Sequence, residues 1–123
     1  MNKIIQSNSL LVSHLLHSRT QSHIFHFRTN SYSTHKALQS YYEAIVPLID
    51  SYTEAFQGHY GLLNNYKSYP LSDDASNRNI VKYFEKLIPI IENNLVPDPY
   101  LQNIIQSIHE LISKTLYLLK NVK

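Results

Sequence analysis

Four side chains of kinds that bind metal ions stand in the first half of this 123-residue chain. They are His23, His35, Asp50 and Glu54, separated in turn by 12, 15 and 4 residues. Asp50 and Glu54 form an i,i+4 pair, so on a helix they lie side by side and can bind one hard cation together. Imidazole nitrogen is a ligand suited to iron, copper and zinc. The sequence therefore predicts a metal site of two histidines and two carboxylates.

One chain cannot close this site if His35 and Asp50 share a helix. A helix rises about 1.5 Å per residue, so the two residues would be roughly 22 Å apart along its axis. The simplest solution is a two-fold dimer with antiparallel helices. In that dimer His23 and His35 of one subunit meet Asp50 and Glu54 of the other, twice per dimer. We therefore expect a homo-oligomer that contains at least this dimer.

The segment from residue 23 to residue 54 resembles the ferroxidase segment of the Dps-type mini-ferritins, the DNA-protection-during-starvation branch of the ferritin-like superfamily. All three intervals between the four residues agree with that family's motif. Tyr42, Glu43 and Ile45 also stand where the family tends to have a similar residue. The resemblance covers about residues 20–61 by motif and the rest of the chain only by its helix pattern.

This resemblance implies a ferroxidase and iron-storage function. It implies that His23 and His35 bind Fe²⁺ from one side of a two-fold interface, that Asp50 and Glu54 bind it from the other, and that these four residues are also the catalytic ones. The site would hold one or two irons, with Zn²⁺ as a possible substitute. Hydrogen peroxide or dioxygen would be the oxidant, and a dodecameric shell would store the ferric product. DNA binding should be weak or absent, because the termini carry few lysines.

The chain also departs from the family pattern at several positions. Ile24 stands where the family usually has Trp, Arg28 replaces a glycine, and Ala55 replaces an arginine. Pro47 lies between His35 and Asp50, and inside a helix a proline removes one backbone hydrogen bond and clashes with the preceding turn. A kink is therefore predicted there.

Composition limits the class of protein. The length suits one domain, residues 1–123, and the two glycines and the lack of alternating apolar and polar residues argue against a sheet-rich fold. No apolar run approaches a membrane span, and the absence of cysteine fits a reducing compartment. We expect a soluble, cytoplasmic protein. The first 42 residues contain no acidic residue, which is also typical of an organellar transit peptide, but their apolar pairs favour a first bundle helix.

Apolar periodicity predicts four helices and an all-α, ferritin-like up-down four-helix bundle. The first should run from residue 3 or 9 to 29, and the second from about 33 to 60, capped by Ser31 or Ser33 and ended by the glycines at 58 and 61. The third should begin at residues 72–74, be interrupted by Pro89 and end near residues 93–94. The fourth should begin at Asp98 as a cap, with Pro99 in the first helical position.

Other residues leave alternatives open. No Glu-x-x-His motif occurs, which disfavours a di-iron site within one bundle. His26 is either a neighbour that supports the ligands or a residue that packs or faces solvent, and Tyr32 and Tyr42 could quench radicals. Two other functions remain possible: a structural helical oligomer that binds no iron, or a metal-binding module, for instance for Zn²⁺, that does not oxidise Fe²⁺.

Overall fold

The described part of the chain is a bundle of four α-helices. The computed structural model describes residues 2–93 and 96–123, and within them there is no β-strand. Its helices are α1 (Asn2–Arg28), α2 (Tyr32–Tyr60), α3 (Asn77–Glu92) and α4 (Pro99–Asn121). The predicted all-α four-helix bundle is therefore confirmed.

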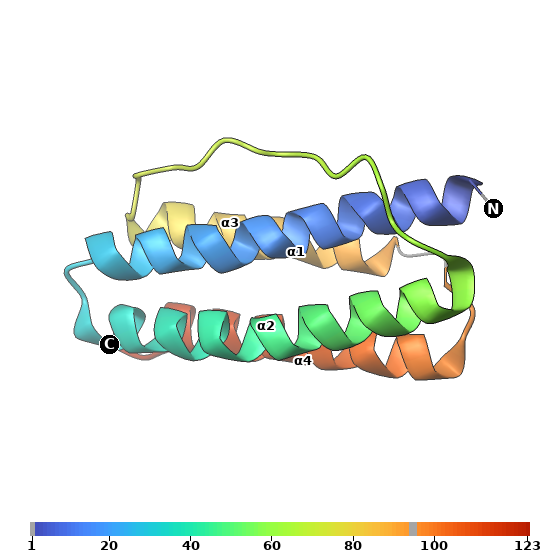
Figure 1. Ribbon diagram of the computed structural model, residues 1–123. Helices are drawn as coiled ribbons and strands as arrows, with labels where there is room; N and C mark the ends of the chain where they lie inside the picture. Colours follow the sequence, from blue (N-terminus) through green and yellow to red (C-terminus); the bar gives the residue numbers. More distant parts are fainter. Residues whose placement is uncertain (1, 94–95) are drawn as a thin grey trace.

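The four helices form two antiparallel pairs. A turn at residues 29–31 joins α1 to α2, and a second short connection joins α3 to α4. Between these pairs, residues 61–76 cross the whole length of the bundle along α1, so that α2 and α3 run in the same direction (Figure 1). Helix α1 packs on α2 and α3, and α4 packs on the same two helices. This single long crossover closes the bundle.

Large apolar side chains fill the centre. Tyr41, Tyr52 and Phe56 of α2 are completely buried, and Phe84 of α3 meets the ring of Tyr41 edge to face at 4.8 Å. The hydroxyl of Tyr41 is 2.7 Å from the hydroxyl of Ser18 on α1, so this buried polar group has a partner. Burial raises the pKa of Tyr41.

Helix α1 differs from the others because many of its buried residues are polar. They include Ser9, Ser13, Ser18, Gln21 and Ser22. Several of them bind the crossover. The Ser13 hydroxyl accepts the N–H of Lys67 at 2.9 Å, and the Gln21 amide makes two 2.8 Å bonds with the main chain of Ser72. The polar face of α1 is thus covered by backbone that needs hydrogen-bond partners.

Several predicted helix boundaries need correction. Helix α3 begins at Asn77 and is capped by the Ser76 side chain, not by residues 72–74, because Ser72 is bound to Gln21. The predicted end near residues 93–94 falls partly on residue 94, outside the described residues. Gly58 lies inside α2, and Gly61, with φ 104°, follows its last residue. The Ser31 cap of α2 is confirmed, since its hydroxyl accepts the N–H of Thr34.

The prolines at 47 and 89 do not interrupt their helices. Helix α2 continues through Pro47 and α3 through Pro89. A proline has no N–H to give to the carbonyl four residues earlier, which here belongs to Glu43 or Glu85. Both prolines and both glutamates are exposed, so water can bind these carbonyls. The break predicted at Pro89 is therefore wrong.

Helix α4 begins as expected, with Pro99 in its first turn. Asp98 precedes it, but its side chain makes no capping bond. It instead accepts the hydroxyl of Tyr60 and lies 3.6 Å from Nε2 of His59. This bond to Asp98 raises the pKa of Tyr60 to about 12. Asp98 therefore joins the start of α4 to the end of α2.

Among the described residues, no helix is both long and apolar enough to cross a membrane.

Candidate functional site

Two histidines connect the end of α1 to the start of α2. The rings of His26 and His35 stack with their centroids 3.7 Å apart and their planes 22° from parallel. Nδ1 of His26 is 2.8 Å from the carbonyl oxygen of His35, and Nδ1 of His35 is 3.0 Å from the carbonyl oxygen of His26. The carbonyl of His26 lies in the last turn of α1, where a helix leaves carbonyls without a partner. The two hydrogen bonds are thus reciprocal.

These bonds fix which nitrogen of each ring carries the hydrogen. A carbonyl oxygen only accepts, so Nδ1 must be the donor in both rings, and Nε2 of each neutral ring keeps a free lone pair. In the described part of the chain, the buried side-chain atoms without a partner are Ser9 Oγ and Thr53 Oγ1. Neither Nε2 is among them, so both nitrogens reach the surface. Metal-binding histidines usually have this arrangement, with the second nitrogen bonded to a carbonyl or carboxylate.

His23 lies beside this pair on α1. Its ring stacks on Tyr42 at 4.1 Å and on Phe27 at 4.5 Å, and it meets the edge of His26 at 5.9 Å. Burial, helped by the charges of Arg19 and His26, lowers the pKa of His23. The ring is therefore more often neutral near pH 6 than a free histidine, and only the neutral ring can bind a metal.

The carboxylates Asp50 and Glu54 lie elsewhere on α2. Helix α2 contains both His35 and Asp50, so the expected separation of roughly 22 Å along one helix applies. Both carboxylates are exposed, and within residues 2–93 and 96–123 neither has a hydrogen-bond or ion-pair partner. The described residues contain no group of three metal-binding side chains that could hold an ion. One subunit thus brings His23 near His35, through His26, and keeps Asp50 and Glu54 apart from them.

The spacing of residues along α2 relates the histidines to the two carboxylates. Tyr42, Val46, Asp50 and Glu54 follow at four-residue intervals, so they form one ridge on the surface of α2. Tyr42 contacts His23 at one end of this ridge, and the two carboxylates stand towards the other end. We call Tyr42, Val46, Asp50 and Glu54 the α2 ridge.

Sequence reasoning left His26 between a supporting role and plain packing or solvent exposure. The structure buries its ring between those of His23 and His35, which excludes the solvent-exposed alternative. Its position three residues after His23, on the same side of a helix, was the available signal. Tyr32 and Tyr42 do lie near the histidines, with ring centroids 6.4 Å from His35 and 4.1 Å from His23.

Two other histidines on α1 hold the crossover. His17 Nδ1 is 2.7 Å from the hydroxyl of Tyr83, and its Nε2 is 2.9 Å from the carbonyl of Pro70. His14 stacks on Tyr69 at 4.2 Å. His14 thus contacts the crossover and His17 contacts both the crossover and α3, so these two histidines stabilise the fold.

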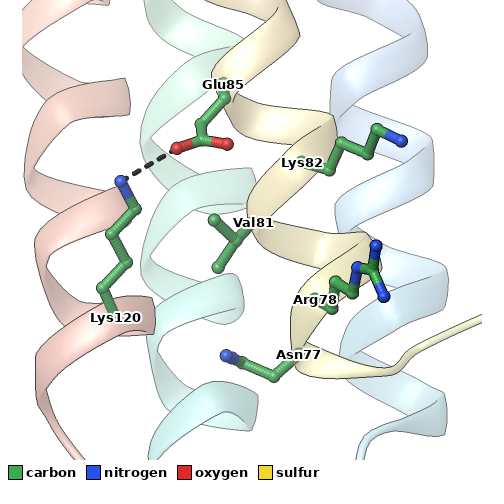
Figure 2. A pocket seen from close by; sticks show the side chains of 6 residues that line it. All are labelled: Asn77, Arg78, Val81, Lys82, Glu85 and Lys120. Atoms are coloured by element: carbon green, nitrogen blue, oxygen red, sulfur yellow. Dashed lines mark ion pairs between the residues drawn. The ribbon is translucent and has the colours of Figure 1, made fainter.

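The acidic residues of α3 and α4 are exposed ion-pair partners. Glu85, Glu92 and Glu110 pair with Lys120, His109 and Lys114, respectively. A pocket of about 430 Å³ opens beside α3 near Glu85. In it, Lys120 reaches from α4 to Glu85 at 2.9 Å, whereas Arg78 and Lys82 extend to the other side of α3 (Figure 2). The basic groups do not converge, so we assign no site there.

A family model matches residues 26–119, which is most of the chain. It describes a family of unknown function, DUF5856. The chain belongs to this family. No curated protein and no solved structure matches it. Of the residues discussed above, His26, His35, Asp50 and Glu54 lie inside the part that DUF5856 covers, and His23 lies just before it.

Proposed function

We propose that this protein is a Dps-type mini-ferritin that binds Fe²⁺ between two subunits and oxidises it. The observation that carries the proposal is the division of the donors within one subunit. Imidazoles with free lone pairs lie at the turn between α1 and α2. Two exposed, unpaired carboxylates lie farther along α2, Asp50 roughly 22 Å and Glu54 roughly 28 Å from His35 along the helix axis. Within one subunit the imidazoles lack the carboxylates as fellow ligands, and a second copy of the chain supplies them.

A two-fold axis at one place on α2 joins both halves. An axis perpendicular to α2 and midway between His35 and Asp50 passes near Tyr42. It brings His35 of each subunit opposite Asp50 of the other. Near that point Val46 of the α2 ridge is 38% exposed, which is apolar surface that a partner would bury. The α2 ridge would then lie in the interface along its length.

The topology supports the same family. Four-helix bundles of the ferritin-like group have one long crossover connection. Residues 61–76 form such a connection between α2 and α3 (Figure 1). The comparisons with known proteins give no information on iron. The proposal of iron binding therefore rests on the topology and on the spacing of His23, His35, Asp50 and Glu54.

The proposed reaction uses iron as the substrate. Nitrogen from His23 and His35 and oxygen from Asp50 and Glu54 form a mixed donor set that suits Fe²⁺. Two Fe²⁺ ions each give up one electron, and one H₂O₂ takes up both electrons and two protons to give two water molecules. Dioxygen is the alternative oxidant. The ferric product is stored as mineral if the dimers assemble into a shell. We place this activity in the cytoplasm. The chain has no cysteine, which fits this reducing compartment, where disulfides are rare.

The test is an anaerobic Fe²⁺ titration followed by substoichiometric H₂O₂, with the ferric absorbance as the readout. We expect saturable binding of one or two irons per subunit and rapid oxidation. Absence of binding above that of the buffer would refute the proposal. Asp50→Asn/Glu54→Gln is the matched variant, because both residues are exposed and unpaired and their loss should leave the bundle folded.

A structural role is the second candidate. The reciprocal bonds of His26 and His35 join α1 to α2 without any metal. A helical assembly protein would keep these bonds and bind no iron stoichiometrically. It would also tolerate Asp50→Asn/Glu54→Gln with no change in any metal-dependent property.

A further inference from the structure

His26 has the same chemical features as His35, although the metal-site spacing does not include it. Both rings donate from Nδ1 to a main-chain carbonyl, and both Nε2 atoms reach the surface. His26 as a whole is only 7% exposed, since Phe27, Tyr42 and the other two histidines pack around it. Its small exposed part includes the nitrogen that could bind a metal.

The stacking of the two rings decides how they could bind metal. A metal ion lies close to the plane of an imidazole that binds it. The planes of His26 and His35 are nearly parallel and their centroids are 3.7 Å apart, so their lone pairs do not converge on one ion. Two ions bound in these planes on the same side of the stack would be about as far apart as the rings are. That separation would match the distance of about 3.5–4 Å between the ions of two-metal sites, with one ion for each ring.

We infer that His26 is a metal ligand and that His26 and His35 each bind one of two adjacent metal ions. The inference rests on the proposed function for the identity of the metal and for the carboxylates that complete the site. It adds a third imidazole from each subunit, and it makes the centre dinuclear. His23, whose ring centroid is 5.9 Å from that of His26, lies on the same side of α1 and completes the imidazole set.

The variant His26→Asn separates metal binding from structure. The amide nitrogen of asparagine occupies the place of Nδ1, so the bond to the carbonyl of His35 can be kept, whereas Nε2 is removed. The bond from His35 Nδ1 goes to the main-chain carbonyl of residue 26, which every residue has. His26→Asn therefore removes a metal ligand and leaves both reciprocal hydrogen bonds available.

The experiment is an anaerobic calorimetric titration with Co²⁺ and then with Fe²⁺. We expect two ions per subunit for the wild type, one for His26→Asn, and an unchanged melting temperature without metal. If His26→Asn still binds two ions, or if the wild type binds one or none, the inference is wrong. If the variant does not fold, two-bond ¹H–¹⁵N spectra of the wild type give the answer: Zn²⁺ should shift the Nε2 resonance of His26, and an unmoved resonance would overturn the assignment.

The double variant Asp50→Asn/Glu54→Gln distinguishes this inference from the proposed function. If this double variant loses Fe²⁺ oxidation while His26→Asn oxidises Fe²⁺ and binds two ions as the wild type does, the ferroxidase stands and the role of His26 fails. If His26→Asn loses one ion while the double variant oxidises Fe²⁺ normally, the histidines bind metal and the shared interface site fails.

Discussion

Mixing two inactive variants should restore activity if the site is shared between subunits. The histidine-deficient variant is His23→Gln/His35→Asn, in which the introduced asparagine amide can still donate to the carbonyl of His26. The carboxylate-deficient variant is Asp50→Asn/Glu54→Gln. Each variant alone has no complete site in any dimer. The separation of roughly 22 Å along α2 prevents repair within one chain.

The expected recovery follows from two-fold symmetry. When equal amounts of the two variants refold together at random, half of the dimers are mixed. A mixed dimer has one site in which both halves are intact and one in which both are damaged, so the mixture should show about one quarter of the wild-type rate. The substitutions at Asp50 and Glu54 should each change stability by less than about 0.5 kcal/mol, because both side chains are exposed and unpaired.

The assay is the initial rate of ferric absorbance after H₂O₂ addition, measured on co-refolded protein. Different affinity tags on the two variants show by sequential purification that mixed dimers formed. Mixed dimers without activity would refute the shared site. Full activity of either variant alone would show that its substituted residues are not required.

Three further outcomes are expected. Tyr41→Phe removes a 2.7 Å bond to the buried Ser18 hydroxyl, so the free energy of unfolding in urea should fall by about 1 kcal/mol; no change would mean that this bond contributes nothing. Gln21→Ala breaks both bonds to Ser72 and should make residues 61–76 more sensitive to limited proteolysis, at unchanged cleavage elsewhere. Because the pKa of His23 is lowered, the unfolded chain binds protons more readily below about pH 6.5. Stability should therefore fall as the pH falls through that value, and His23→Phe should reduce the fall; an equal fall in the variant would contradict this.

The helices could be predicted from the sequence to the extent that their buried faces are apolar. Helix α4 has a regular apolar stripe and begins at Pro99 as predicted. Helix α1 has a weak pattern, because Ser13, Gln21 and other polar residues are buried against the crossover. Burial of these residues depends on a loop that is distant in sequence, so the pattern of α1 alone could not reveal it.

The start of α3 was misplaced for a related reason. Ser72 and the aspartates after it have the composition of a helix cap. The structure uses Ser72 to bind Gln21 and caps the helix with Ser76 instead. Both serines satisfy the local rule, and only the tertiary contact with α1 distinguishes them.

The candidate site was predicted in part. Apolar periodicity predicted one helix over both His35 and Asp50, their spacing implied that one chain separates them, and the continuous α2 confirms this placement. The stacking of His26 on His35 could not be predicted, because it depends on how the turn at residues 29–31 brings the two helices together. Whether a second subunit completes the site remains a prediction.

The crossover also has a consequence for the order of folding. Helices α1 and α2 are joined by a turn of a few residues, so their contacts are local and form early. Docking of the α3–α4 pair requires closure of the chain between Tyr60 and Asn77, at an entropic cost of about 2.5 kcal/mol. We expect the hairpin of α1 and α2 to form first. His23, His26 and His35 would then come together before the rest of the bundle is complete. A metal ion present during synthesis would therefore meet these imidazoles while the chain is still folding.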